Sequence, residues 1–169
     1  MTMKRICLLA AVLCVWPGPG GAQTTAELID DGRNTDNVTT QSMGYHRRNY
    51  SPLAQINRST VTRLVPIWST SLMNDRGELA APTVYNGVMY VINGRWTFAI
   101  DVETGAQIWR TPVTSDPDVG RVTPFGAITR GAATIYDGKL FRIAIDNHLI
   151  ALDNEVLADQ IATNSPRNG

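Results

Sequence analysis

The stretch from Thr83 to Tyr90 reads Thr-Val-Tyr-Asn-Gly-Val-Met-Tyr, and 51 residues later the stretch from Thr134 to Phe141 reads Thr-Ile-Tyr-Asp-Gly-Lys-Leu-Phe. Each stretch is a pair of β-prone runs around an Asn-Gly or Asp-Gly dipeptide. Such dipeptides accept positive φ at both central positions of a two-residue turn. We therefore predict two β-hairpins of the same design, with their tips at Asn86-Gly87 and Asp137-Gly138.

A second pair of matching segments follows the two hairpins. Thr97-Phe-Ala-Ile-Asp101 matches Leu149-Ile-Ala-Leu-Asp153 at a spacing of 52 residues. A period of about 40 to 50 residues, with about four strands in each unit, is typical of a β-propeller blade. The predicted fold is therefore all-β: a partial β-propeller of about two to three blades, preceded by short helices.

The turn after Asp101 has the chemistry of a hairpin between two propeller strands. The Asp101 carboxylate can hydrogen-bond the backbone of the turn, and Gly105 can take a left-handed conformation. Trp109 then lies on the outgoing strand, where its large ring can fill the space between neighbouring blades. Trp68 precedes Trp109 by 41 residues and suits the same role one blade earlier, on a strand expected over 67–69.

Two short helices are expected before the first blade. The first covers 25–32, with Thr25 as its cap and Gly32 as its end. The second begins at Asn57, which acts as its cap. The residues between 33 and 50 are polar and are expected to form loops, with the basic cluster 46–48 in a solvated turn.

The segment 1–22 has the order of a secretory signal peptide. Lys4 and Arg5 are followed by an apolar run from Ile6 to Trp16, then by prolines and glycines and the small residues before Gln23. The apolar run is too short for stable insertion across a bilayer, which takes about 20 residues. We therefore expect an exported, periplasmic protein.

Composition excludes several classes of protein. The chain has 169 residues, 15 basic against 15 acidic, and 43% are hydrophobic, as in ordinary globular domains. The balanced charge argues against a nucleic-acid partner, because phosphate binding needs clustered Lys and Arg. Both cysteines, Cys7 and Cys14, lie within the segment 1–22, so the remaining chain has no disulfide, thiolate metal site or cysteine nucleophile.

These segments resemble a known family. The opening Tyr50-Ser-Pro-Leu-Ala-Gln-Ile-Asn57 is similar to that of the alcohol dehydrogenases that depend on pyrroloquinoline quinone (PQQ), the methanol/ethanol type of quinoprotein. The segment from Arg130 to Phe141 is similar to their repeat, as is the Thr104-Gly105 turn that leads to Trp109. The resemblance covers about residues 43 to 153.

The resemblance implies a propeller of about eight blades with PQQ and a calcium or lanthanide ion on its axis. It implies oxidation of primary alcohols, with electrons passed to a cytochrome c. Arg130 matches the arginine that hydrogen-bonds the quinone, and a guanidinium suits a cofactor with several carboxylates. Thr129 lies where the family usually has Asn. Phe125 offers an apolar face for stacking on the quinone.

The chain also departs from the family pattern. The adjacent cysteines that cover the quinone in the family fall on Pro124-Phe125 here. Leu79 falls where many members have a quinone-contacting Glu, with Glu78 beside it. The catalytic Asp and the metal ligands belong to family segments beyond residue 169, so no catalytic or metal-binding residue is assigned.

The repeat is lost after Asp153. At the spacing of 52 residues, Gly105 corresponds to Leu157 and Trp109 to Ile161. The sequence therefore divides into a signal peptide (1–22), a partial propeller (23–153) and a divergent tail (154–169). A shortened reading frame and a functional short paralogue both remain open as explanations.

Two functions follow from this organisation. The first is the N-terminal fragment of a periplasmic quinoprotein alcohol dehydrogenase, inactive alone and in need of further blades or a partner chain to cover its open edges. The second is a non-enzymatic periplasmic propeller that acts as a scaffold or binding protein. The opening at Tyr50 and the position of Arg130 favour the first.

We predict export with cleavage after Ala22, because the small residues Gly20, Gly21 and Ala22 follow the apolar run. Intact-mass analysis of the exported protein should give a chain that begins at Gln23. A secreted chain that still begins at Met1 would contradict this prediction.

Overall fold

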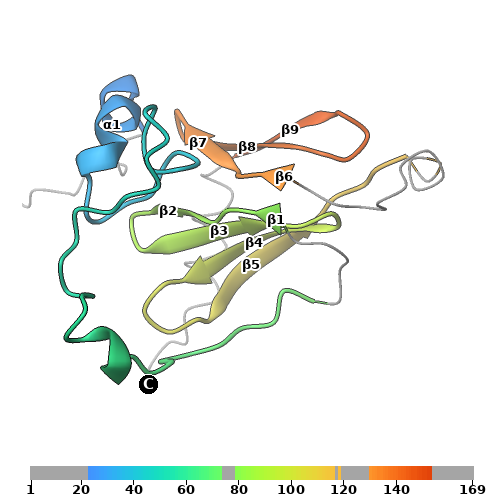
Figure 1. The fold of residues 1–169 in the computed structure, drawn as a ribbon. Coiled ribbons are helices and arrows are strands. Elements are labelled where there is room, and N and C mark those ends of the chain that lie inside the picture. Colours follow the sequence, from blue (N-terminus) through green and yellow to red (C-terminus); the bar gives the residue numbers. More distant parts are fainter. Residues whose placement is uncertain (1–22, 74–78, 117, 119–129, 154–169) are drawn as a thin grey trace, which may run out of the picture.

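The computed structural model describes residues 23–73, 79–116, 118 and 130–153 of the chain. Two antiparallel sheets form its body (Figure 1). The first has the order β2-β3-β4-β5, and the second has the order β7-β8-β9. The strands of the first sheet are β2 (Thr83–Tyr85), β3 (Val88–Ile92), β4 (Trp96–Asp101) and β5 (Gln107–Pro112). Those of the second are β7 (Thr134–Tyr136), β8 (Lys139–Ile143) and β9 (Leu149–Asp153).

The two predicted hairpins are confirmed. Thr83 pairs with Tyr90 across the first turn, and Thr134 pairs with Phe141 across the second. Asn86 and Gly87 have φ of 49° and 77°, and Asp137 and Gly138 have φ of 47° and 69°. Positive φ at both positions is the geometry that Asn-Gly and Asp-Gly favour, so the turn residues fix the register of each pair.

The matched strands of the repeat occupy the same place in both sheets. β4 and β9 are each the third strand, paired with β3 and β8 respectively. Beside them, β1 (Leu79–Ala80) and β6 (Arg130–Gly131) form a short parallel ladder. The prediction of an all-β partial propeller with nearly complete blades is confirmed.

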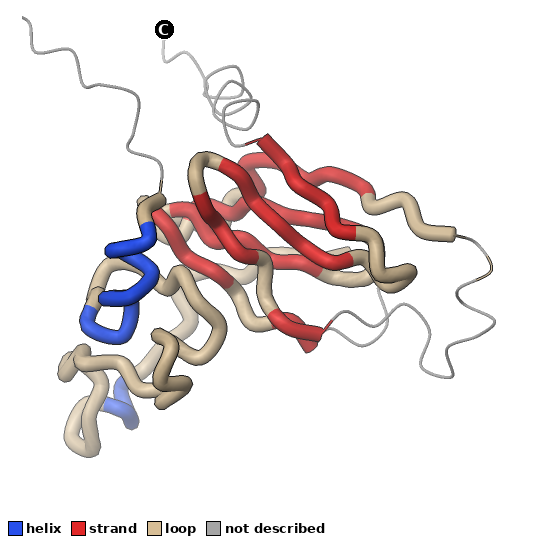
Figure 2. The backbone as a smooth tube through the Cα atoms, turned by 90° about the horizontal axis from the view of Figure 1, so that it is seen from above, coloured by secondary structure: helices blue, strands red, loops and turns tan. Residues whose placement is uncertain are grey.

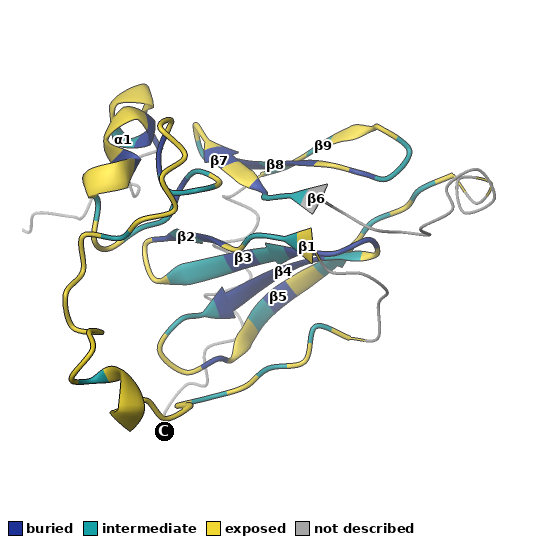
Figure 3. Cartoon of the chain, viewed as in Figure 1, coloured by how far each residue is buried: buried dark blue, intermediate teal, exposed yellow. Residues whose placement is uncertain are grey.

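The sheets stack face to face around one apolar core (Figures 1 and 2). Trp109 from β5 is 4% exposed, and its ring lies 6.1 Å from that of Tyr90. The same cluster takes residues from both sheets: Tyr85, Ile92, Ala99, Ala133, Ile135 and Leu140. Figure 3 shows buried residues on strands of both sheets. The expected placement of Trp109 between sheets is confirmed, because burial against the second sheet shields its ring from water.

A buried arginine also joins the two sheets, and the sequence analysis did not predict it. Arg142 on β8 is 2% exposed. Its Nη1 donates to the Trp96 carbonyl at 2.7 Å and to Thr97 Oγ1 at 3.0 Å, while its Nη2 donates to the Asn93 carbonyl at 2.6 Å. These acceptors lie in the turn between β3 and β4 and at the start of β4. Their hydrogen bonds replace the water that the guanidinium loses.

The prediction for Trp68 holds in part: the residue packs on the first sheet, but not between two sheets of the part that the structure describes. Its indole N–H donates to the Val102 carbonyl at 2.9 Å, and its ring lies over Gly105. The predicted strand over 67–69 is wrong, however. The segment is extended, but it pairs with no strand among the described residues, so it belongs to no sheet.

The N-terminal helix begins one residue earlier than expected. Thr24, not Thr25, caps α1 (Thr25–Asp30), because Thr24 and Glu27 form a reciprocal capping box. Instead of ending at Gly32, the α-helix gives way to a 3₁₀ turn, η1 (Asp31–Arg33). The loop that follows is tied to this turn by the Asp31 carboxylate, which accepts hydrogen bonds from the backbone and hydroxyls of Thr39 and Thr40.

The second predicted helix is also corrected. Only a 3₁₀ turn, η2 (Val61–Arg63), forms, and Thr60 precedes it without a side-chain cap. The Asn57 side chain accepts from the backbone and hydroxyl of Ser59, as an N-cap does, and the Asn57 carbonyl accepts from the Val61 N–H at 2.9 Å. Asn57 therefore caps a single helical turn, which continues as η2 and not as an α-helix. The cluster 46–48 is exposed, as predicted for a solvated turn.

Two glycines allow a test of the Trp68 contact. Gly105 and Gly87 both have positive φ, of 71° and 77°, so alanine at either costs about 1–2 kcal/mol in backbone strain. At Gly105 the added Cβ would also lie 2.5 Å from Trp68 Cδ2, whereas at Gly87 it would meet nothing within 4 Å. We expect Gly105→Ala to lower the free energy of unfolding by about 1–3 kcal/mol more than Gly87→Ala.

Urea unfolding of both variants measures this difference. In a Trp68→Ala background the excess cost of Gly105→Ala should vanish, because the ring that the methyl group meets is gone. Equal costs for the two glycine variants in the native background would contradict the placement of Trp68.

Candidate cofactor-binding edge

The two sheets begin side by side at the β1–β6 ladder. Leu79 is the register partner of Arg130, and Ala80 is the partner of Gly131. The Ala81 N–H also donates to the Gly131 carbonyl at 2.9 Å. Both register pairs join residues that lie one repeat apart, at the spacing that separates Thr83 from Thr134. Equivalent positions of successive sheets are therefore neighbours at one edge. This is the arrangement expected of a propeller, in which the first strands of successive blades surround a common axis.

A further contact fixes this edge behind the ladder. Thr83 Oγ1 at the start of β2 donates to the Ala133 carbonyl at 2.6 Å, just before β7. Thr83 is 1% exposed and Ala133 is 2% exposed. The hydroxyl thus satisfies a buried carbonyl of the neighbouring sheet, and the entry points of both sheets are held at a fixed separation.

The predicted site residues belong to β1 and β6 or precede these strands in the sequence. The backbone of Arg130 forms the first residue of β6. Phe125, Thr129 and Glu78 lie outside the described residues. Leu79, where the family pattern has Glu, is 58% exposed on β1. The structure therefore brings together the positions of Leu79 and Arg130, and their separation by one repeat was the signal in the sequence that could have foretold it.

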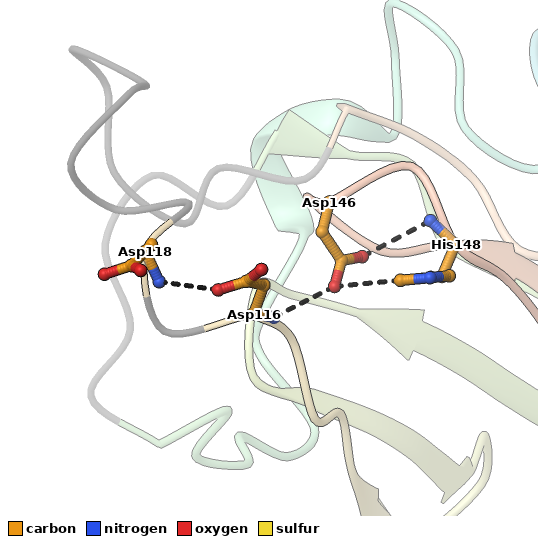
Figure 4. Close-up of polar contacts among 4 residues, drawn as sticks. All are labelled: Asp116, Asp118, Asp146 and His148. Carbon is orange, nitrogen blue, oxygen red and sulfur yellow. Dashed lines mark hydrogen bonds and ion pairs between the residues drawn. The ribbon is translucent and has the colours of Figure 1, made fainter.

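A second polar cluster ties two loops together near the end of β8 (Figure 4). Asp146 Oδ2 accepts from the Asp116 backbone N–H at 3.0 Å and lies 3.0 Å from His148 Nδ1. The hydrogen bond from the His148 side chain, followed by that from the Asp116 backbone, lowers the pKa of Asp146 to about 2. This arrangement fastens the segment after β5 to the β8–β9 turn, which is a structural role.

The Asp101 carboxylate has the role predicted for it in the β4–β5 turn. Its Oδ1 accepts from the Thr104 hydroxyl and backbone N–H, both at 2.8 Å, and from the Glu103 N–H at 3.0 Å. The Thr104 hydroxyl is the main reason that the pKa of Asp101 is lowered. This turn presents Gly105 to Trp68.

The described part of the chain offers neither a metal centre nor a membrane span. Across residues 23–73, 79–116, 118 and 130–153, no group of three or more His, Cys, Asp or Glu could hold a metal ion. Over the same ranges, no helix is both long and apolar enough to cross a bilayer. A hollow of about 340 Å³ lies between α1 and the loop that follows it, and its lining includes Arg33, Tyr45, His46 and Arg48.

The repeated sheets and their common edge place the chain in the class of β-propeller folds. The family model for the PQQ glucose/ethanol/alcohol dehydrogenase β-propeller domain matches residues 40–156. The chain belongs to this family of PQQ-dependent alcohol dehydrogenases.

Relatives of known activity support this assignment. The chain is 36% identical over 160 residues to a quinohemoprotein alcohol dehydrogenase of Comamonas testosteroni, covering 87% of this chain and 22% of the relative. It is 39% identical over 110 residues to a 1-butanol dehydrogenase (cytochrome c) of Thauera butanivorans, covering 62% and 15%. The chain thus spans about a fifth of the length of the relatives it matches.

Solved structures show the same fold. The quinohemoprotein alcohol dehydrogenase ADHIIG of Pseudomonas putida HK5 superposes with a TM-score of 0.73 at 30% identity, covering 79% of this chain and 19% of that one. A europium-containing methanol dehydrogenase superposes with a TM-score of 0.68 at 28% identity, covering 76% and 23%.

The Asp146 cluster predicts a pH dependence. Because the folded chain lowers the pKa of this carboxyl from 3.8 to about 2, its ionised form stabilises the fold above about pH 4. This contribution is lost as the pH falls from about 4 to about 2. We expect stability to fall less over this range in Asp146→Asn than in the native chain, as measured by urea unfolding at several pH values.

Asp137→Asn is the matched control, since it removes the same charge at an exposed hairpin tip where Asn is equally suited to positive φ. It should leave the pH dependence unchanged. An unchanged dependence in Asp146→Asn as well would show that the cluster does not hold its carboxylate ionised.

Proposed function

We propose that this chain is the N-terminal part of a periplasmic quinoprotein that oxidises primary alcohols with PQQ, and that it does not oxidise alcohols alone. The β1–β6 ladder is the observation that carries the proposal. It aligns Leu79 and Arg130, the positions that the family pattern gives to quinone contacts, at one edge of two successive blades.

Arg130 fits an acidic cofactor at this edge. A guanidinium donates several hydrogen bonds in a plane, which suits a quinone that carries carboxylates. We propose that Arg130 binds PQQ, that Thr129 lies beside it, and that Phe125 stacks on the ring. When bound, the quinone supplies the oxidising power for the alcohol.

One edge is a weak site when it stands alone. A hydrogen bond to a charged group contributes about 1.5–3 kcal/mol, whereas micromolar affinity needs about 8 kcal/mol. The described residues contain no cluster that could hold the calcium or lanthanide ion of the family. Side chains from further blades would have to complete both sites, so we expect weak binding of PQQ and no turnover.

Export and electron transfer belong to the same proposal. The order of charged, apolar and small residues in 1–22 favours secretion to the periplasm. The name of the relative from Thauera butanivorans includes cytochrome c. We propose that a cytochrome c accepts electrons once the remaining blades are present.

The test combines the purified chain with PQQ, calcium or a lanthanide, ethanol and an artificial electron acceptor. We expect no dye reduction that depends on both quinone and alcohol. Titration with PQQ should give a dissociation constant well above about 1 μM. Arg130→Ala should weaken binding further, while Arg58→Ala, a change at an exposed arginine in a loop, should not.

Dye reduction that requires quinone and ethanol and disappears in Arg130→Ala would overturn the proposed inactivity while placing Arg130 in the site. If Arg130→Ala and Arg58→Ala bind PQQ equally, the assignment of Arg130 is wrong.

A further inference from the structure

The third strands of the two sheets match in sequence but differ in burial. On β4, Thr97, Phe98 and Ala99 are each 0% exposed. On β9, the equivalent Leu149 is 69% exposed, and Ala151 is exposed as well. The difference is one of neighbours: β4 lies between β3 and β5, whereas β8 is the one strand beside β9 in the described part of the chain.

The hydrogen-bonding groups of β9 follow a fixed alternation. The Ala144 N–H donates to the His148 carbonyl at 2.8 Å, which makes these two residues a hydrogen-bonded pair at the open end of the β8–β9 ladder. In an antiparallel ladder every second pair is of this kind. The main-chain groups of Leu149 and Ala151 therefore point away from β8. Their counterparts on β4, Thr97 and Ala99, pair with Thr111 and Trp109 of β5.

A sequence like that of β5 occurs earlier in the chain, in an extended segment that belongs to no sheet among the described residues. Ile67-Trp68-Ser69-Thr70 repeats Ile108-Trp109-Arg110-Thr111 at a spacing of 41 residues. Its backbone is extended, and Ile67 is 80% exposed although Ile108 is half-buried. Trp68 is already seated on the β4–β5 turn through Val102. The segment 66–71 thus matches a fourth strand in sequence and packs on the neighbouring blade, but it pairs with no strand in the described part of the chain.

The sequence after β9 does not offer the same strand. At the spacing of 52 residues, Leu157 stands for Gly105 and Ile161 stands for Trp109. Nor does β9 carry the lysine or proline that exposed edge strands use to prevent pairing, since it reads Leu-Ile-Ala-Leu-Asp. The sheet β7-β8-β9 thus presents three strands, and the segment 66–71 presents a sequence that matches a fourth.

We propose that copies of this chain associate head to tail, with the segment 66–71 of one copy pairing as the fourth strand beside β9 of the next. The register of β4 with β5 sets the pairing: Ala151 opposite Trp68, Ile150 opposite Ser69 and Leu149 opposite Thr70. The two surfaces differ, so the contact is heterologous, and successive copies either close a ring or extend a filament. This inference concerns the assembly of the chain and does not depend on the proposed binding of PQQ.

Cysteine cross-linking tests the register. The full chain with Cys7→Ser and Cys14→Ser has no other thiol. One preparation carries Ser69→Cys and another carries Ile150→Cys, a pair whose main chains do not bond to each other and so lie closest. On mixing under mild oxidation we expect a disulfide-linked heterodimer. The control pair, Thr70→Cys with Ile150→Cys, places the side chains on opposite faces and should link at most about a tenth as fast. Equal rates for both pairs would overturn the proposed register.

Sedimentation over a range of concentrations tests the association itself. Leu149→Lys places a charge on the exposed edge and should weaken association at least about tenfold, with an unchanged circular dichroism spectrum. Ile29→Lys makes the same change at a residue that is 64% exposed on α1 and should not weaken it. A native chain that is monomeric at every concentration, or equal association in both lysine variants, would overturn the proposal.

Discussion

Arg142 extends from β8 into the first sheet and donates to the carbonyls of Asn93 and Trp96, and the stacking of the two sheets depends on this contact. A guanidinium that is 2% exposed is costly to bury, so only an arrangement that supplies its acceptors is stable. The apolar core between the sheets is not directional and would tolerate sliding. The arginine, together with the hydrogen bond from Thr83 to Ala133, selects one relative position.

That position brings the starts of both sheets together. Leu79 and Arg130 lie one repeat apart in sequence, as do Ala80 and Gly131. The ladder therefore pairs each residue with its equivalent in the next repeat. The ladder alone therefore brings equivalent positions of successive blades together at this edge. In a propeller each blade adds its own side chains to a shared axis.

Some of the exposed apolar residues lie on faces that no neighbouring sheet covers in the described part of the chain. Ile67 and Val65 are 80% and 74% exposed on the segment beside β5, and Leu149 is 69% exposed on β9. Repeat proteins bury such faces only against the next unit. Trp68 shows the principle within this chain, since its ring lies over Gly105 and is bonded to Val102, while Ile67 beside it faces water.

The sequence by itself determined the local structure and the repeat. Asn86-Gly87 and Asp137-Gly138 define their turns because few other residue pairs accept positive φ at both positions. The spacing of Trp68 and Trp109 predicted that both rings pack against a sheet. The sequence did not reveal that residues 67–69 stay outside a sheet, because strand assignment depends on a partner that lies elsewhere in space. Nor did it single out Arg142 from other strand arginines, or the pairing of Leu79 with Arg130, since both follow from how two distant segments stack. Tertiary structure decided these features because long-range contacts, and not local propensity, set which groups lose water.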